Sequence, residues 1–255
     1  MYVWFSNDKN ENSVPPYEPF DVTPSQKSLC FRGTSFNKIS CHVSDIAENG
    51  GDVLHFKYVH NEILPYLVNG YWDARWIRGD DPLLREKLNQ KDKKLNEYRM
   101  KLIDRYVTEE NKKYIGVINL DNEISILNLP LKLNFFFLTG FQVGPGLVYL
   151  FIKGKFFETF LIQYVQTKEK FQQLLYHDIY CNYLAPYWFS ALQLRLEVRQ
   201  VMNDCVIWDN KKFGYTSFFN KNDKQADESL ITWRKWYSQF YKGCKKNENK
   251  NALDW

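Results

Sequence analysis

The sequence ENGGDVLHFKYVH, residues 48–60, decides how the rest of the chain is interpreted. It holds two of the chain's four histidines, His55 and His60, and Asp52 precedes the first of them by three residues. On an ideal helix, residues three apart lie about 60° from each other and residues five apart about 140°. Asp52 and His55 would therefore share a face, whereas the two histidines can bind one metal only if the helix is distorted or ends between them.

This stretch predicts a candidate metal site. Histidine is the commonest metal ligand, although it is also an ordinary helix residue. Two imidazoles and one carboxylate would form a facial triad, which leaves positions on Fe(II) open for O₂ and substrate. The carboxylate is not local, and the residues by themselves leave four candidates in the C-terminal half of the chain: Asp178, Glu197, Asp204 and Asp209.

Composition predicts a folded chain and excludes some classes of function. The chain has 255 residues, of which 44% are hydrophobic and 17% aromatic, so it can build a core or line an apolar cavity. Residues 85–113 carry ten Lys/Arg and six Asp/Glu, which accounts for the whole net charge of +4. A nucleic-acid binder would instead gather basic residues on one face. Five scattered cysteines without a C-x-x-C motif disfavour a disulfide framework and predict a reducing compartment.

Hydrophobic patterns predict an α+β fold, with an antiparallel sheet and long C-terminal helices. The uncharged run 133–152 is interpreted as two strands around a Gly-Pro-Gly turn and not as a membrane span. The expected strands cover residues 28–33, 39–45, 114–120, 124–138, 146–152 and 156–167. Helices are expected at 47–60, 83–107, 183–209 and 229–241. The first would start near Asp45 or Asn49, and the second would lie on the surface. The third would follow Pro186 and pack through Leu192, Leu196, Val201 and Trp208.

Several motifs together carry a resemblance to a known family. The pattern E-N-x-x-D-x-x-H-x-x-x-x-H of residues 48–60 resembles the mononuclear iron motif of Rieske non-haem iron oxygenases. Four further stretches are similar to the sterol 7-desaturase branch of that family: VGPGLVYL (143–150), YLAPY (183–187), NDCVIWDNKKF (203–213) and WRKWYSQFY (233–241). The similarity runs from about residue 1 to residue 241, and the charged insert near 83–113 fits it less well.

The resemblance implies a role for each residue that matches the motif. His55, His60 and Asp204 would hold a mononuclear Fe(II). Asp52 would be the acid that hydrogen-bonds a ligand histidine and passes electrons from the Rieske centre of a neighbouring subunit. Its expected place on the face of His55 suits a partner that orients a metal ligand. Asn49 would lie near the iron or, alternatively, begin the helix as its N-cap.

The resemblance also implies a fold and an activity. Residues 21–255 would be a helix-grip (START/Bet v 1-like) catalytic domain, and residues 1–20 the end of a Rieske domain with its linker. The full enzyme would use O₂ and electrons from NAD(P)H, delivered by a reductase, to introduce a 7,8 double bond into cholesterol or a related sterol. A homotrimer is implied because electrons would cross between subunits. With an N-terminal anchor the full-length protein would sit on the cytoplasmic face of the endoplasmic reticulum, whereas this chain is expected to be soluble.

The chain shows no sequence motif for a Rieske cluster. Such a [2Fe–2S] cluster needs two cysteines and two histidines, in C-x-H and C-x-x-H form, and none of the five cysteines fits. The cluster is therefore expected from a missing domain or a partner chain. Three alternatives stay open: a sterol or lipid carrier with the same fold, a Rieske oxygenase acting on another apolar substrate, and a hydrolytic zinc enzyme, which lacks a convincing general base. His177 and Asp178 in YHDIY are interpreted as structural or surface residues.

Overall fold

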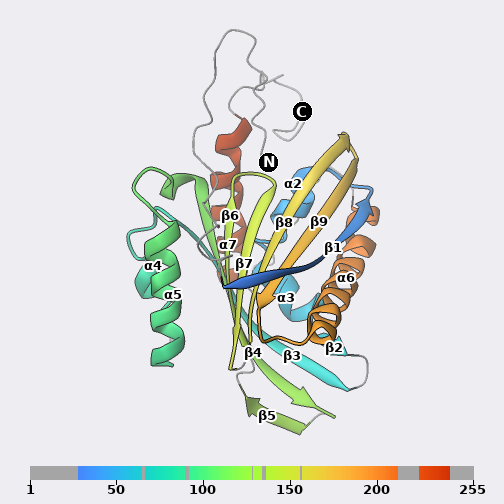
Figure 1. The fold of residues 1–255 in the computed structure, drawn as a ribbon. Coiled ribbons are helices and arrows are strands. Elements are labelled where there is room, and N and C mark those ends of the chain that lie inside the picture. The colour runs from blue at the N-terminus through green and yellow to red at the C-terminus, as the bar shows by residue number, and fades with distance from the viewer. Residues whose placement is uncertain are drawn as a thin grey trace.

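The computed structural model describes residues 28–64, 67–89, 92–127, 129–133, 136–155, 157–211 and 224–241. Within these ranges, nine strands form one antiparallel sheet in the order β1-β9-β8-β7-β6-β4-β3-β2, with β5 paired to β4 (Figure 1). The predicted α+β class is confirmed. The expectation for residues 1–20 lies outside the described residues. The strands are β1 (Leu29–Ile39), β2 (Glu62–Leu64), β3 (Val68–Arg78), β4 (Ile115–Ile126), β5 (Leu129–Leu133), β6 (Phe136–Val143), β7 (Leu147–Gly154), β8 (Glu158–Glu169) and β9 (Gln172–Asn182).

Helices cover both faces of this sheet. Figure 1 shows α4 and α5 on one side and α6 on the other. The helices are α2 (Val43–Glu48), α3 (Val53–Val59), α4 (Leu84–Lys87), α5 (Lys93–Tyr106), α6 (Tyr187–Asn210) and α7 (Lys224–Tyr237), with short 3₁₀ helices η1 (Lys112–Tyr114) and η2 (Ser238–Tyr241).

The sequence of β7 explains why both faces are covered. Its side chains alternate, as they do in any strand. Tyr149 and Phe151 join the core beneath α5, whereas Leu150 and Ile152 pack in the core around Trp233 of α7. A strand that is apolar on both sides is stable only between two layers, so the central strands lie between two sets of helices.

Most of the uncharged run 133–152 forms a hairpin of β6 and β7, in agreement with the predicted pair of strands. Strands β6 and β7 pair antiparallel, from Phe136 opposite Gly154 to Val143 opposite Leu147. Gly144 has a φ of 68°, a conformation that glycine adopts without steric cost. None of the helices that the structure describes combines the length and the hydropathy needed to cross a membrane.

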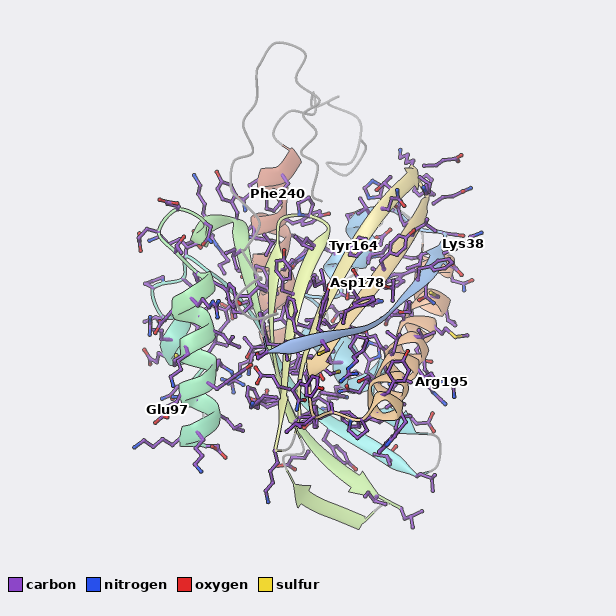
Figure 2. The ribbon with its side chains drawn as sticks, in the orientation of Figure 1. Lys38, Glu97, Tyr164, Asp178, Arg195 and Phe240 are labelled. Carbon is purple, nitrogen blue, oxygen red and sulfur yellow. The ribbon has the colours of Figure 1, made fainter. Side chains whose placement is uncertain are left out.

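The charged segment 83–107 is not the single surface helix that its pattern predicts. It forms the two helices α4 and α5, and its leucines enter the main core: Leu88 is 1% exposed and Leu102 8% exposed. The charged residue Glu97 lies on the outer side of α5 (Figure 2). Arg99 is fully buried and contacts Asp121 at 2.8 Å. Although α4 and α5 are rich in charged residues, the segment also has a narrow apolar face that packs in the main core.

The N-terminal elements also differ from expectation. Only one of the two strands expected in residues 28–45 exists, because His42 caps a helix that begins at Val43. The helix expected at 47–60 is divided into α2 and α3. Strands β2, β3 and β9 were not predicted, because the residues between the expected elements show no sufficiently clear alternation.

Helix α6 confirms the long helix expected after Pro186. Proline has no N–H to lose at a helix start, and α6 begins at the next residue. The helix packs on β1 and β9, with Val201 and Trp208 buried among residues of the sheet. Leu192 was expected in this interface but is 40% exposed, so it lies on another face. The packing of α6 fixes the position of Asp204 relative to α3.

Candidate metal centre

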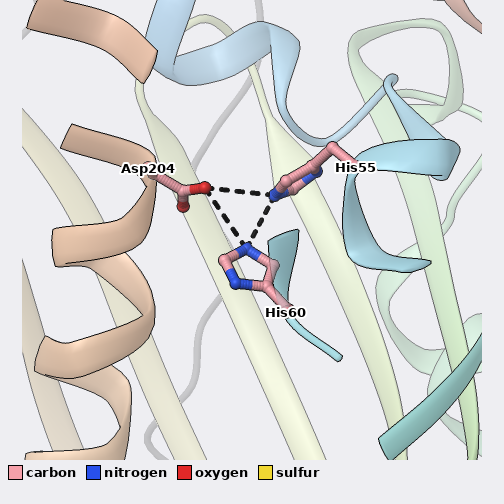
Figure 3. Close-up of side chains that lie close together, drawn as sticks. All are labelled: His55, His60 and Asp204. Atoms are coloured by element: carbon pink, nitrogen blue, oxygen red, sulfur yellow. Dashed lines mark hydrogen bonds and ion pairs between the residues drawn. The ribbon is translucent and has the colours of Figure 1, made fainter. Parts of the chain in front are cut away.

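Three side chains from α3, its C-terminus and α6 converge in the described part of the chain. His55, His60 and Asp204 each offer a ligand atom, and these atoms all lie within 4.8 Å of one another (Figure 3). The two Nε2 atoms are 2.7 Å apart, and each lies 3.4 Å from Asp204 Oδ1. All three residues are at most 9% exposed. The structure thus selects Asp204 from the four acids that the sequence left open.

The end of α3 resolves the unfavourable spacing of the two histidines. Helix α3 stops at Val59, and His60 is its C-cap with φ −106° and ψ 15°. The helix therefore ends between His55 and His60, and this is one of the two geometries that allow histidines five residues apart to bind one metal. At the other end, the side chain of Asp52 caps α3 by accepting a hydrogen bond from the His55 backbone N–H at 3.3 Å. The helix that carries His55 is short and fixed at both ends.

The hydrogen bonds of the two rings define their tautomers. His55 Nδ1 lies 3.2 Å from the carbonyl oxygen of Asp52, and His60 Nδ1 lies 2.6 Å from Gln200 Oε1. Because both partners are acceptors, each Nδ1 carries the hydrogen and each Nε2 presents a bare lone pair. Asp204 Oδ1 has no hydrogen-bond partner among the described residues. Three electron-rich atoms therefore face one another, which suits a bound cation.

The pKa values of the site reflect the same arrangement. Although burial by itself would raise the pKa of Asp204, the adjacent rings of His55 and His60 lower it below the usual value, because either ring in its protonated form would donate to the carboxylate. Although burial by itself would lower the pKa of His60, the Asp204 carboxylate beside its Nε2 raises it, because the carboxylate stabilises the protonated ring. A buried carboxylate that attracts a proton onto a neighbouring imidazole offers the same place to a metal ion, which competes with that proton.

The structure also places the remaining predicted site residues. Asp52 contacts the ring of His55 through its main-chain carbonyl, and its carboxylate caps the helix. Asn49 is the C-cap of α2, so the alternative that it begins a helix is wrong. The other three candidate acids bond elsewhere: Asp178 accepts from Thr34 Oγ1 at 2.6 Å, Asp209 accepts from the Ser40 backbone N–H at 3.2 Å, and Glu197 lies 3.4 Å from His177 Nε2.

Sequence reasoning missed three neighbours of the site. Gln200 bonds the ring of His60, and Trp72 Nε1 donates to the His60 carbonyl at 2.7 Å. The ring of Phe56 lies 4.3 Å from the ring of His55. Gln200 precedes Asp204 by four residues, so helical spacing could have revealed it. Trp72 lies on β3, and no sequence signal connected it with the histidines.

Comparisons with known proteins identify a family and several relatives of this chain. Residues 3–241 match the family model described as 3-Ketosteroid 9alpha-hydroxylase C-terminal domain. Relatives include cholesterol 7-desaturase nvd 1 of Ciona intestinalis, 27% identical over 94% of this chain and 46% of the relative. Another is cholesterol 7-desaturase of Caenorhabditis elegans, 25% identical over the whole chain and 57% of the relative. The chain thus spans about half the length of the curated relatives it matches.

A solved structure shares the fold. Dicamba monooxygenase bound to 3,6-dichlorosalicylic acid superposes with a TM-score of 0.54 over 89% of this chain and 64% of that chain. The two sequences are 10% identical, so this likeness concerns the fold alone. The buried His-His-Asp group is consistent with the mononuclear iron site of Rieske oxygenases. Since the family model covers nearly the whole chain, the chain belongs to the 3-ketosteroid 9alpha-hydroxylase C-terminal domain family, the catalytic domain of Rieske oxygenases.

Proposed function

We propose that this chain is the catalytic domain of a cholesterol 7-desaturase, which introduces a 7,8 double bond into cholesterol or a related sterol. The observation that carries this proposal is the buried triad of His55, His60 and Asp204, found in a chain with several relatives named cholesterol 7-desaturase. The proposed reaction balances: cholesterol, O₂, NAD(P)H and a proton give 7-dehydrocholesterol, NAD(P)⁺ and two waters.

The triad would hold Fe(II) through His55 Nε2, His60 Nε2 and Asp204 Oδ1. When bound, the iron supplies the centre at which O₂ is reduced with electrons from outside the chain. The protein's part is to present two neutral imidazoles and a single carboxylate. This donor set cancels one of the two positive charges of the ion and leaves coordination positions free. Burial of all three residues keeps bulk water away from the place where the substrate would be oxidised.

Asp52 is the residue proposed to connect this site with an electron source, and Asn49 is proposed to lie near the iron. Asp52 begins α3, is half-buried, and touches the ring of His55 through its carbonyl. It is therefore in direct contact with the ligand histidine and is partly accessible to solvent. Electrons would come from NAD(P)H through a reductase and a [2Fe–2S] cluster, held by a Rieske domain elsewhere in the full protein or in a partner chain. A homotrimer would bring that cluster from a neighbouring subunit.

Hydrogen peroxide allows a test on this chain without a Rieske cluster. Peroxide has the oxidation level of O₂ with two added electrons, so cholesterol and one peroxide would yield the 7,8-diene and two waters. We expect the Fe(II)-loaded chain to form 7-dehydrocholesterol, detected by mass spectrometry and by the ultraviolet absorbance of a conjugated diene. The variants His55→Ala and Asp204→Asn should not form it. A product that carries added oxygen, with no diene, would identify a hydroxylase and contradict desaturation.

Two other functions make different predictions in binding and turnover. A pure lipid carrier would bind cholesterol equally well in the wild type and in the variant that combines His55→Ala with His60→Ala, and would gain nothing from iron. A Rieske oxygenase for another apolar substrate would bind iron but leave cholesterol unchanged. The unpartnered Oδ1 of Asp204, which faces two imidazole nitrogens, favours a metal enzyme over a carrier, because a buried unpaired polar group destabilises a fold that has no use for it.

A further inference from the structure

The inner face of α6 carries polar side chains where a packed helix usually has an apolar stripe. These side chains are spaced three or four residues apart, so they lie on one side of the helix: Ser190, Gln193, Glu197, Gln200 and Asp204. The partners of Gln193 and Glu197 lie on the sheet, and that of Gln200 lies at the candidate metal centre. Gln193 accepts a hydrogen bond from Thr159 of β8 at 3.1 Å, and Gln200 bonds His60. A polar stripe therefore runs along the helix–sheet interface, away from the metal centre.

His177 of β9 faces the middle of this stripe. It is fully buried, and its Nε2 lies 3.2 Å from Gln163 Oε1 and 3.4 Å from Glu197 Oε1. Because both neighbours are acceptors, Nε2 carries the hydrogen and Nδ1 is left as an acceptor. Burial lowers the pKa of His177 despite the nearby charges of Glu197 and Asp178, so the ring is neutral at pH 7. Nδ1 has no hydrogen-bond partner among the described residues.

Ser35 of β1 offers the complementary group. It stands directly opposite His177 in the register of β1 and β9, so their Cβ atoms are about 5 Å apart. The Oγ of Ser35 is buried and likewise has no partner among the described residues. A buried acceptor and a buried hydroxyl lie side by side, and neither is bonded within the described chain. Buried polar groups are normally paired, so this pair calls for a partner that the described chain does not supply.

We propose that His177 Nδ1 and Ser35 Oγ form a subsite that binds a hydroxyl group on an otherwise apolar substrate. The substrate hydroxyl would donate to His177 Nδ1 and accept from the Ser35 hydroxyl. This inference rests on the proposed function and deepens it, because cholesterol carries one hydroxyl on an apolar skeleton. Glu197, beside His177, precedes Asp204 by seven residues, roughly 10 Å along the helix axis. A sterol held at its hydroxyl could therefore still reach the metal centre.

The test compares two ligands that differ only in the hydroxyl. Cholesterol and cholest-5-ene, its hydrocarbon counterpart, are partitioned from cyclodextrin onto this chain, and the two dissociation constants are measured. We expect cholesterol to bind on the order of tenfold more tightly, since two neutral hydrogen bonds are made to groups otherwise left unpaired. Equal binding of both ligands overturns the subsite and leaves the proposed function standing. Binding of neither ligand overturns the sterol assignment itself.

Variants of His177 and Ser35 then test which side chains bind the substrate hydroxyl. Asn places an oxygen as many bonds from Cα as Nδ1, whereas Gln places its polar atoms at the position of Nε2. We expect His177→Asn to keep the preference for cholesterol, and His177→Gln and Ser35→Ala to reduce it several-fold. Asp178→Asn is the matched control, because Asp178 is the next residue of β9 and bonds Thr34 instead (Figure 2). A preference that survives in both His177→Gln and Ser35→Ala, with circular dichroism unchanged, contradicts the assignment.

Discussion

The Nε2 atoms of His55 and His60 lie 2.7 Å apart, although each ring already directs its Nδ1 hydrogen to an oxygen. Two bare ring nitrogens at this distance repel each other unless a cation lies between them and Asp204. The protein therefore holds its ligands in an arrangement that is unfavourable when empty. Such an arrangement links metal binding to the stability of the fold.

Metal binding should raise the melting temperature. A ligand at one hundred times its Kd stabilises the folded state by about 2.7 kcal/mol. For a chain of this size, we expect an increase of about 5–10 °C from that free energy. The measurement is anaerobic differential scanning calorimetry with Fe(II), or with Co(II) as an air-stable substitute. His55→Ala should abolish the increase, whereas His177→Gln should keep it. An undiminished increase in His55→Ala would mean that the metal binds elsewhere.

Gln200 should contribute to metal affinity without being a ligand. Its Oε1 accepts from His60 Nδ1 at 2.6 Å and keeps Nε2 free of hydrogen. Loss of such a partner typically weakens metal affinity about 10–100-fold. We expect this for Gln200→Leu in an anaerobic Fe(II) titration against a competing chelator. Gln193→Leu is the control, because Gln193 lies on the same side of α6 but bonds Thr159. Equal affinities in the wild type and Gln200→Leu would show that this hydrogen bond does not orient the ring.

The sequence restricted the candidate metal centre to two histidines and four acids, whereas it missed several elements of the surrounding fold. The spacing of His55 and His60 restricted the geometry to a distorted or interrupted helix, and α3 does end between them. Helical periodicity alone could not choose Asp204, because the choice depends on how α6 packs against α3. Two other features were missed for related reasons. The capping of α2 by His42 depends on local side-chain geometry, and strand β3 depends on pairing with β4, which is distant in sequence.

Lys211 should stabilise the fold up to alkaline pH. Its Nζ lies 2.8 Å from Asp45 Oδ1 and 3.5 Å from Glu48 Oε1, which ties the end of α6 to α2. Although burial by itself would lower the pKa of Lys211, the charges of Glu48 and Asp45 raise it above 10.5. A raised pKa in the folded state means that the stabilisation is complete below pH 10.5 and is lost as pH rises through the higher value.

The variant Lys211→Met tests whether the stabilisation by Lys211 decreases as pH rises. Charged hydrogen bonds contribute about 1.5–3 kcal/mol, so we expect a loss of about 2 kcal/mol in the free energy of unfolding at pH 8. Urea denaturation should give the same difference between wild type and variant at pH 9, and a smaller one above pH 11. A difference that grows with pH would contradict the assignment. Lys168 on β8 is exposed, and Lys168→Met serves as the surface control.

Replacement of Gly51, at the turn before α3, should reduce both the stability of the fold and the affinity for Fe(II). A Cβ added at Gly51 would clash with Cγ and Cβ of Trp233, which is 2% exposed and donates to Gln142 Oε1 at 2.9 Å. Because Trp233 is fixed, Gly51→Ala must displace the chain that leads into His55. Overpacking of this kind costs about 1–3 kcal/mol. We expect that loss in urea denaturation, together with weaker Fe(II) binding.

The control for this prediction is Gly146→Ala. A Cβ at Gly146 would meet only Val165 Cβ at 3.8 Å, an ordinary contact, so both stability and Fe(II) affinity should stay close to those of the wild type. The two substitutions add the same methyl group, and they differ in what it meets. If Gly51→Ala lost stability but bound Fe(II) as tightly as the wild type, the clash would be absorbed by α7. The position of α3 would then not depend on close approach of the Gly51 backbone to Trp233.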